Sequence, residues 1–279
     1  MERRVFRAMG TEIELLVDAD GADAALEAAE QEFHRLESLL SRFRADSQLS
    51  RLNRDGVVEA GHDLLRVVAL SLDGRERTGG RFDPTVHDAL VAAGYDRTFD
   101  EISSTARSDT WLPAAAGGDV TIDGERIQLE PGVRLDLGGI GKGYAAERAA
   151  ELLATAGPCL VNAGGDIALR GGSWPVGVDD ALTLELSNCG LATSGRDRRH
   201  WRRGERELHH LIDPSTGEPS DSDVLHVTVV ASDAVEAEIA AKGLFLAGAE
   251  RACAEADAAG TPAVIVTGDG RRLLAGGIA

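Results

Sequence analysis

Residues 134–148, with the sequence RLDLGGIGKGYAAER, form the densest group of residues in the chain that suits binding of an anion. Four glycines accompany Asp136 and Lys142 there. Alternating apolar residues from 133 to 137 predict a strand, the glycines predict a tight turn, and residues 144–156 continue at helical spacing. Free backbone amides and the positive end of a helix dipole both favour phosphate at such a helix start. The stretch therefore predicts a phosphate-binding turn.

Two known phosphate-binding patterns fit this stretch incompletely. A Walker A loop needs Ser or Thr at position 143 and Gly at position 136, where the chain has Gly143 and Asp136, so that pattern is excluded. A dinucleotide-binding fingerprint fits loosely as Gly141-x-Gly143-x-x-Ala146, but the strand before it carries Arg134 and Asp136 instead of a buried apolar run. A dinucleotide oxidoreductase and a glycine-rich connection without a ligand stay open as alternatives.

A pair of histidines, His209 and His210, lies in an expected strand over residues 207–212. Histidine is the side chain whose unperturbed pKa lies nearest neutrality, which suits a general base. The alternative is that the two side chains alternate across the strand, one exposed and one in a satisfied core hydrogen bond.

The basic residues are unevenly distributed. Lys142 and Lys242 are the two lysines of the chain, and every other basic residue is Arg, which draws attention to both positions. The one strong basic cluster consists of Arg196, Arg198, Arg199, Arg202, Arg203 and Arg206. This cluster is either a solvated loop or a local positive charge for a phosphate-bearing ligand.

The composition of the 279 residues is that of an ordinary globular protein, with 43% hydrophobic and 27% charged residues. A formal net charge of −18 argues against nucleic acid and anionic membranes as general partners. Three widely spaced cysteines match no zinc or disulfide spacing, and neither a signal core nor a run of membrane-spanning length is found. We therefore expect a cytoplasmic protein without membrane insertion.

The hydrophobic periodicity predicts more strands than helices. Helices are expected at residues 23–43, 63–78 and 234–246, and strands at 5–17, 120–129, 159–162, 174–178, 182–186, 191–193, 225–230, 263–267 and 271–274. Ser194-Gly195 is expected to form a turn and the arginine cluster a loop, and Pro84 suits a helix start. Because strands and helices do not alternate strictly, we expect a mixed α+β fold and not a doubly wound sheet.

The chain resembles the FAD:protein FMN transferase family, also called ApbE, from Met9 to Gly248. The resemblance rests on short motifs in a fixed order: MGT (9–11), SRFRADS (41–47) ending in LN (52–53), FDPTV (82–86), LDLGGIGKG (135–143), NAGGD (162–166), TSG (193–195) and HLIDPSTG (210–217). It implies one strand-rich, T-fold-like domain over residues 1–279, with helices packed on antiparallel sheets and with or without two lobes around a central FAD site.

The resemblance also implies an activity, the transfer of the FMN half of FAD to a Ser or Thr hydroxyl of an acceptor protein, with release of AMP. Such a reaction needs an in-line nucleophile, a base for the hydroxyl proton and positive charge over the pyrophosphate. His210 matches the family's proposed base. The positions matching flavin or nucleotide contacts are Met9, Phe43, Arg81, Phe82, Asp83, Asp136, Lys142, Ser194, Gly195 and Ile212.

This chain departs from the family at the metal. The usual Mg²⁺ site combines a backbone carbonyl, here that of Gly139, with an Asp and a Thr from a late helix, and these positions are occupied by Glu238 and Lys242. An ammonium cannot ligate a cation and repels one. Three hypotheses stay open. In the first, Lys242 is held by Glu238 at i, i+4 and replaces the metal electrostatically. In the second, the protein only binds or hydrolyses FAD, and in the third, Lys242 extends to solvent.

Overall fold

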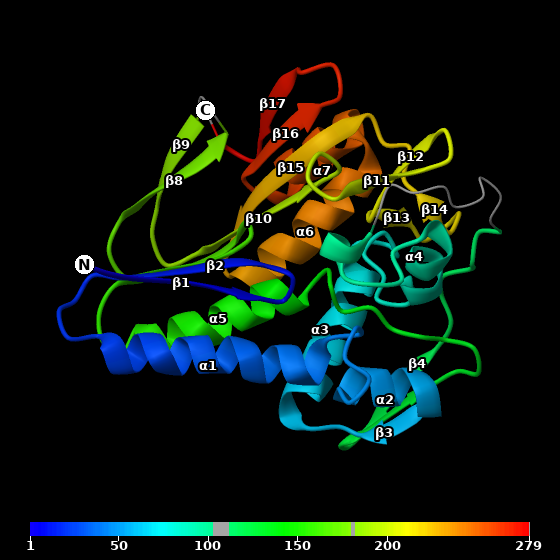
Figure 1. Cartoon of the computed structure of the whole chain (residues 1–279). Coiled ribbons are helices and arrows are strands. Elements are labelled where there is room, and N and C mark those ends of the chain that lie inside the picture. Colours follow the sequence, from blue (N-terminus) through cyan, green and yellow to red (C-terminus); the bar gives the residue numbers. More distant parts are fainter. Residues whose placement is uncertain (103–111, 180–181, 279) are drawn as a thin grey trace.

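An eight-stranded sheet runs through the centre of the molecule (Figure 1). The computed structural model describes residues 1–102, 112–179 and 182–278. The strands neighbour one another in the order β1-β2-β6-β7-β10-β15-β16-β17, and each neighbouring pair is antiparallel. Their bounds are β1 Glu2–Ala8, β2 Thr11–Val17, β6 Cys159–Ala163, β7 Asp166–Arg170, β10 Gly190–Gly195, β15 Val224–Ala231, β16 Ala263–Thr267 and β17 Arg272–Ala275.

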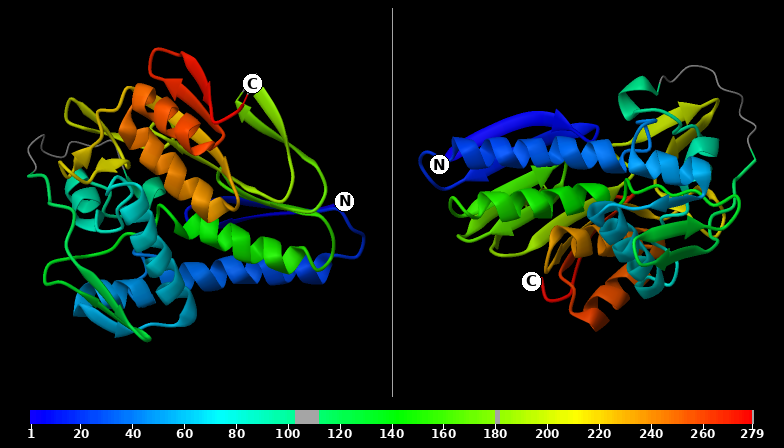
Figure 2. Two further views of the ribbon diagram at one scale, coloured as in Figure 1. Left: turned by 180° about the vertical axis from the view of Figure 1, so that it is seen from behind. Right: turned by 90° about the horizontal axis from the view of Figure 1, so that it is seen from below.

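Seven helices accompany the sheet in the described part of the chain. They are α1 Asp23–Leu40, α2 Gln48–Asp55, α3 His62–Arg77, α4 His87–Ala93, α5 Gly141–Leu153, α6 Ala234–Ala247 and α7 Ala249–Ala259, with a 3₁₀ turn η1 at Phe99–Glu101. Helices α5 and α6 pack on the central strands, α7 packs on β16 and β17, and α1 runs beside α5 (Figure 2). The expectation of a mixed α+β fold with helices on an antiparallel sheet is confirmed.

A small three-stranded sheet and three pairs of short strands surround this framework. They are β3 Val57–Glu59, β4 Val120–Asp123 and β5 Arg126–Leu129 in one sheet, and the pairs β8 Trp174–Asp179 with β9 Leu182–Leu186, β11 His200–Arg203 with β12 Arg206–His209, and β13 Ile212–Asp213 with β14 Glu218–Pro219. The hairpin expected at residues 120–129 is confirmed as β4 and β5.

Side chains alternate between two apolar layers on the central sheet, as the pleat requires. In β6, Cys159 and Val161 point into the core beneath α1 and α5, whereas Leu160 joins Trp174 and Val176 of the β8–β9 hairpin on the opposite face. A continuous apolar run in the sequence therefore serves two cores, because both faces of this strand are covered.

Capping residues set several helix ends. The hydroxyl of Ser47 accepts a hydrogen bond from Ser50 N at the start of α2, and the carboxylate of Asp233 does the same for Glu236 N at the start of α6. Gly56, in a left-handed conformation with φ of 73°, ends α2. These local signals explain why the helix boundaries follow the sequence closely.

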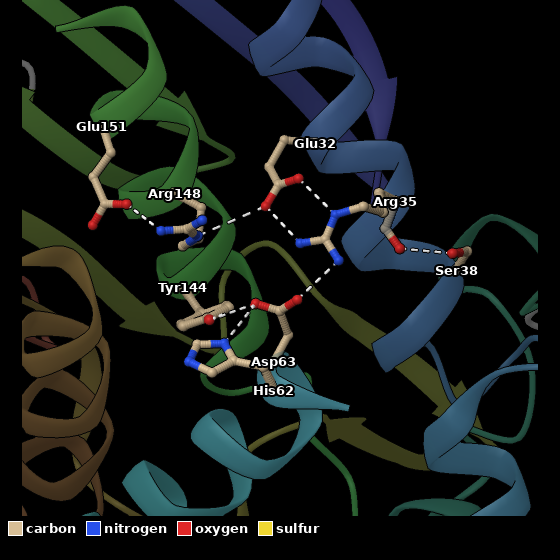
Figure 3. Close-up of polar contacts among 8 residues, drawn as sticks. All are labelled: Glu32, Arg35, Ser38, His62, Asp63, Tyr144, Arg148 and Glu151. Atoms are coloured by element: carbon tan, nitrogen blue, oxygen red, sulfur yellow. Dashed lines mark hydrogen bonds and ion pairs between the residues drawn. The ribbon is translucent and has the colours of Figure 1, made fainter. Parts of the chain in front are cut away.

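A polar network joins α1, α3 and α5 (Figure 3). Asp63 accepts a hydrogen bond from the Tyr144 hydroxyl at 2.7 Å and forms an ion pair with Arg35 at 2.8 Å. Burial opposes the charge of Asp63, but these two partners outweigh burial and lower its pKa. Glu32 also binds Arg35 and lies 3.7 Å from Arg148 of α5. The first turns of α5 are thus held by α1 and α3.

The strand expected over residues 133–137 does not form. The side-chain amide of Asn53 donates to Leu135 O and accepts from Leu135 N, each at 2.8 Å, and Asp136 N donates to Pro84 O at 2.8 Å. These partners satisfy the backbone groups that a neighbouring strand would otherwise bind. Leu135 and Leu137 are nevertheless buried, which explains the misleading alternation.

Other expectations need smaller corrections. Ser194 and Gly195 are the last residues of β10 and pair with β15, so they form no turn. The arginine cluster is only partly a loop, because Arg202 and Arg203 lie in β11 and Arg206 begins β12. Strand β12 ends at His209 and not at residue 212, α4 begins three residues after Pro84, and the helix α7 was not predicted.

Helices α5 and α6 approach most closely at Gly143. An ideal Cβ at Gly143 would lie 2.7 Å from Ala234 O and 2.9 Å from an oxygen of Glu238. Both neighbours belong to α6, and one is backbone, so neither can move easily. This contact fixes the glycine turn of residues 138–143 against α6.

We expect Gly143→Ala to lower the free energy of unfolding by about 1–3 kcal/mol, because the methyl group overpacks the α5–α6 contact. Gly141→Ala is the matched control, since nothing lies within 4 Å of an ideal Cβ there, and it should leave stability unchanged or raise it by up to ~1 kcal/mol. Urea denaturation of the two variants measures the difference. Equal effects would contradict the close approach.

Candidate functional site

A cavity of about 320 Å³ lies where the β1–β2 turn, the glycine turn, α6 and the end of β12 meet. Its volume is within the range of small-molecule and cofactor sites. Most of the predicted site residues line it: Met9, Phe43, Arg81, Phe82, Asp83, Asp136, Gly139, Lys142, His210, Ile212 and Lys242. A larger hollow of about 1000 Å³ shares only Arg42 with this cavity and contains none of the predicted residues.

Ser194 and Gly195, which we expected in the same pocket, do not line the cavity. Ser194 is buried in β10 opposite Val227, and an ideal Cβ at Gly195 would lie 2.7 Å from His226 Cβ. Because both residues pair along β10 and β15, their backbones serve the sheet.

Aromatic rings form one wall of the cavity. Phe43 and Tyr95 lie 5.8 Å apart between ring centroids, and the guanidinium of Arg42 stacks over both, 4.1 Å from Phe43 and 4.7 Å from Tyr95. Phe43 keeps 39% of its surface exposed, whereas Tyr95 is buried. An exposed aromatic face beside a buried ring suits stacking of a flat heterocycle.

Arg42 also holds the glycine turn. It forms an ion pair with Asp136 at 2.5 Å, with both side chains almost fully buried, and donates to Tyr95 O at 2.7 Å. The other oxygen of Asp136 accepts from Gly138 N at 2.8 Å. Asp136, which the resemblance implies as an FAD contact, is therefore occupied mainly in positioning the turn.

The FDPTV turn is held in a similar way. Arg75 binds Asp83 at 3.0 Å, and the other oxygen of Asp83 accepts from Thr85 N at 2.8 Å. Arg81 forms an ion pair with Glu255 of α7 at 2.5 Å. Phe82, between them, is buried and carries its ring 5.6 Å below Lys242 Nζ.

Lys142 is bound by two buried carboxylates. Its Nζ donates to Asp166 Oδ2, and to Glu238 Oε1 at 2.8 Å. Burial alone would lower the pKa of Lys142, but the two carboxylates outweigh it and raise that pKa. Burial and the charge of Glu238 raise the pKa of Asp166 to about 6, against the opposing effect of Lys142.

Lys242 has a different environment. The described residues offer its Nζ no hydrogen bond and no ion pair, and this nitrogen lies over Gly139, where an ideal Cβ would be 1.8 Å away. Burial lowers the pKa of Lys242, and the charges of Glu238 and Asp136 offset only part of that effect. The expected i, i+4 pair with Glu238 is wrong, because Glu238 binds Lys142 and, at 3.0 Å, Gly143 N.

The two neighbouring histidines have distinct roles. Both ring nitrogens of His209 are bound, Nε2 by donating to Ser220 O at 2.9 Å and Nδ1 by accepting from Leu211 N at 3.2 Å. This is the satisfied core histidine that we considered as an alternative. His210 lines the cavity, and its Nδ1 lies 3.3 Å from Arg199 O. Since a carbonyl only accepts, Nδ1 carries the proton and Nε2 keeps its lone pair.

The pKa of His210 lies well below its ordinary value. Burial is the largest cause, and the positive charges of Arg199 and Lys242 add to it. His210 is therefore a neutral imidazole at pH 7, which is the form that accepts a proton.

The residues implied for a Mg²⁺ ion do not fit one. The described residues contain no group of three or more His, Cys, Asp and Glu side chains arranged to hold a metal ion. Both oxygens of Glu238 are hydrogen-bonded within the protein, and the ammonium of Lys242 covers Gly139. A cation there would have one free carbonyl and an ammonium as its neighbour.

Three residues of the site were missed in the sequence. Arg42 lies inside the SRFRADS motif, where only Phe43 was singled out, and Tyr95 follows the predicted turn by nine residues. Arg199 was noticed only as one of six clustered arginines, although its backbone orients His210 and its side chain lines the cavity. The arginine excess was the available signal, but it did not distinguish one arginine from the next.

Comparison with known proteins shows the family of the chain. A model described as the ApbE family matches residues 9–265. The chain belongs to the ApbE family. Among curated relatives, the FAD:protein FMN transferase of Treponema pallidum is 29% identical and that of Escherichia coli K12 is 27% identical. The matches cover 83% and 85% of this chain, and 73% and 74% of the relatives.

Solved structures of ApbE proteins share the fold. The ApbE protein of Thermotoga maritima superimposes with a TM-score of 0.87 at 25% identity, covering 98% of this chain and 96% of the other. The flavin transferase ApbE of Vibrio cholerae gives a TM-score of 0.81 at 24% identity, covering 98% and 96%. In the described residues, no helix is both long and apolar enough to cross a membrane.

The two lysines of this ApbE chain should respond oppositely to loss of charge. Lys142→Met leaves two buried carboxylates without their cation and should lower the free energy of unfolding by about 3–5 kcal/mol. Lys242→Met removes an ammonium that has no hydrogen bond or ion pair among the described residues, so in the absence of ligand it should be neutral or stabilise by about 1 kcal/mol. Urea denaturation at pH 7 compares them, and losses of equal size would show that Lys242 is paired in solution.

Proposed function

We propose that this chain is an FAD:protein FMN transferase, which moves the FMN half of FAD onto a Ser or Thr hydroxyl of an acceptor protein. Membership of the ApbE family and the activity for which its relatives are named support the reaction class. The observation that carries the proposal is the neutral His210, with a free Nε2 lone pair in a cavity that also holds Lys242 and Arg199.

The aromatic and basic walls suit the two parts of FAD. In the proposed binding mode the isoalloxazine ring stacks near Phe43 and Met9, and the pyrophosphate lies near Lys242 and the glycine turn. The backbone of Met9 is held by a 2.8 Å hydrogen bond from its N–H to Glu37. This hydrogen bond anchors the β1–β2 turn to α1.

The reaction requires few steps from the protein. The acceptor hydroxyl oxygen bonds to the phosphorus of the FMN phosphate, the bond from that phosphorus to the bridging oxygen breaks, and AMP leaves with the bridging oxygen. The hydroxyl proton passes to Nε2 of His210. Positive charge from Lys242 and Arg199 offsets the negative charge that develops on the phosphoryl oxygens.

His210→Ala should lower the rate of FMN transfer roughly 10²- to 10⁴-fold, since it removes the base. FAD binding should persist, because His210 contributes no positive charge at pH 7. His34→Ala, a change at a half-exposed histidine on α1, is the control and should transfer at the wild-type rate. Mass spectrometry of an acceptor domain with its target threonine detects the FMN-sized gain.

The products of the same reaction decide between the proposal and its rivals. Free FMN and AMP without a gain on the acceptor would indicate an FAD hydrolase. Bound FAD without either product would indicate a flavin-binding protein. Full transfer by His210→Ala would remove His210 from the mechanism.

The pH profile of kcat/KM should retain more than half of its plateau at pH 6.5. The pKa of His210 in the folded protein lies well below the ordinary value of 6.5 because of burial and the charges of Arg199 and Lys242. Between these two values the folded protein keeps the base neutral, while the unfolded chain binds a proton. The contribution of His210 to stability is thus fully present above pH 6.5 and is lost as pH falls through this window.

Transfer rates at subsaturating FAD between pH 5 and 8 measure this acid limb. Lys242→Met should move the limb to higher pH, because it removes a like charge near His210. A half-maximal rate at or above pH 6.5 in the wild type would contradict the lowered pKa.

A further inference from the structure

Among the described residues the ammonium of Lys242 forms no hydrogen bond and no ion pair, and its Nζ lies 5.6 Å from the centroid of the Phe82 ring. The carboxylates that raise its pKa, Glu238 and Asp136, are both engaged elsewhere, Glu238 by Lys142 and Asp136 by Arg42. An unpaired charge that is partly withdrawn from water is unfavourable unless something else neutralises it. Lys242 lines the cavity, so a negatively charged ligand bound there would neutralise its charge.

The surroundings of Lys242 select an anion. Arg199, His210 and the glycine turn border the same cavity, and the positive charge of Lys242 is near enough to act on His210. Helix α5 begins at Gly141, so the positive end of its dipole adds to the positive potential at this turn. A pyrophosphate is the part of FAD that carries negative charge.

A divalent cation would meet the opposite conditions. Lys242 Nζ lies over Gly139, and the oxygens of Glu238 are already used by Lys142 Nζ and Gly143 N. Admitting a cation would require Lys242 to leave the cavity and Glu238 to release Lys142, which would leave that buried lysine with Asp166 alone. The protein therefore holds a fixed positive charge where a cation would otherwise bind.

We propose that the ammonium of Lys242 takes the place of a divalent cation and binds the pyrophosphate of FAD directly, so that FAD binding does not depend on Mg²⁺. The proposal rests on the proposed function for the identity of the ligand. Lys142 does not share this role, because its charge is neutralised by Asp166 and Glu238. Lys142 thus stabilises the fold of the site, and Lys242 binds the phosphates.

Flavin fluorescence titrations of the whole chain test this proposal. FAD affinity is measured in EDTA and again in MgCl₂, for the wild type, Lys242→Met and the control Arg3→Met. Arg3 lies on β1, is exposed and pairs only with Glu14 in the described structure, so Arg3→Met removes one positive charge away from the cavity. Riboflavin, which lacks phosphate, is the second probe.

Wild-type FAD affinity should be the same within about twofold in EDTA and in MgCl₂, because a cation that does not bind cannot shift the equilibrium. Lys242→Met should weaken FAD binding roughly 10- to 100-fold, the effect of one charge-assisted contact, and leave riboflavin binding unchanged. Arg3→Met should bind both as the wild type does. The unchanged riboflavin affinity shows that the Lys242→Met cavity is folded.

Two results would overturn the proposal. One is wild-type FAD binding that requires Mg²⁺, and the other is Lys242→Met with wild-type FAD affinity in EDTA. These outcomes are separate from failure of the proposed function. Loss of FMN transfer to every acceptor, with Lys242-dependent FAD binding intact, would refute the transferase and leave the Lys242 contact standing. FMN transfer by a protein whose FAD binding requires Mg²⁺ would do the reverse.

Discussion

The carboxylate of Glu238 joins the two halves of the site. One oxygen accepts from Gly143 N in the first turn of α5, and the other binds Lys142 Nζ, so α6 is tied to the glycine turn by both backbone and side chain. The contact is possible because Gly143 has no side chain to separate the helices. Burial of the Glu238 carboxylate would be unfavourable without these donors. The glycine turn and α6 therefore hold each other in position.

Three acidic groups near the cavity are matched to cations of the protein. Asp136 is matched to Arg42, and Glu238 and Asp166 share Lys142. Lys242, in contrast, forms no ion pair with any of the described residues. An overall charge of −18 therefore coexists with a cavity that attracts an anion, because pairing at close range decides the local potential and the charge of exposed carboxylates is screened by solvent.

Much of the fold and of the cavity lining could be predicted from the sequence, because the relevant signals are local. Helix α1 follows its apolar stripe, the β4–β5 hairpin follows its turn pair, and Phe43 and His210 lie in short motifs. Contacts between distant residues could not be predicted. Leu135 looked like a strand residue because Asn53, 82 residues away, satisfies its backbone. Glu238 was assigned to Lys242 by helical spacing, whereas α5 offered it a better partner.

In the proposed complex Lys242, and not a divalent cation, binds the pyrophosphate of FAD. A crystal structure of the FAD complex grown with Mn²⁺, whose anomalous scattering marks a bound ion, tests it most directly. We expect Lys242 Nζ to lie within hydrogen-bonding distance of a pyrophosphate oxygen, and we expect no manganese peak beside Gly139. A manganese ion between Gly139 O, Glu238 and the pyrophosphate, with Lys242 turned out of the cavity, would contradict it.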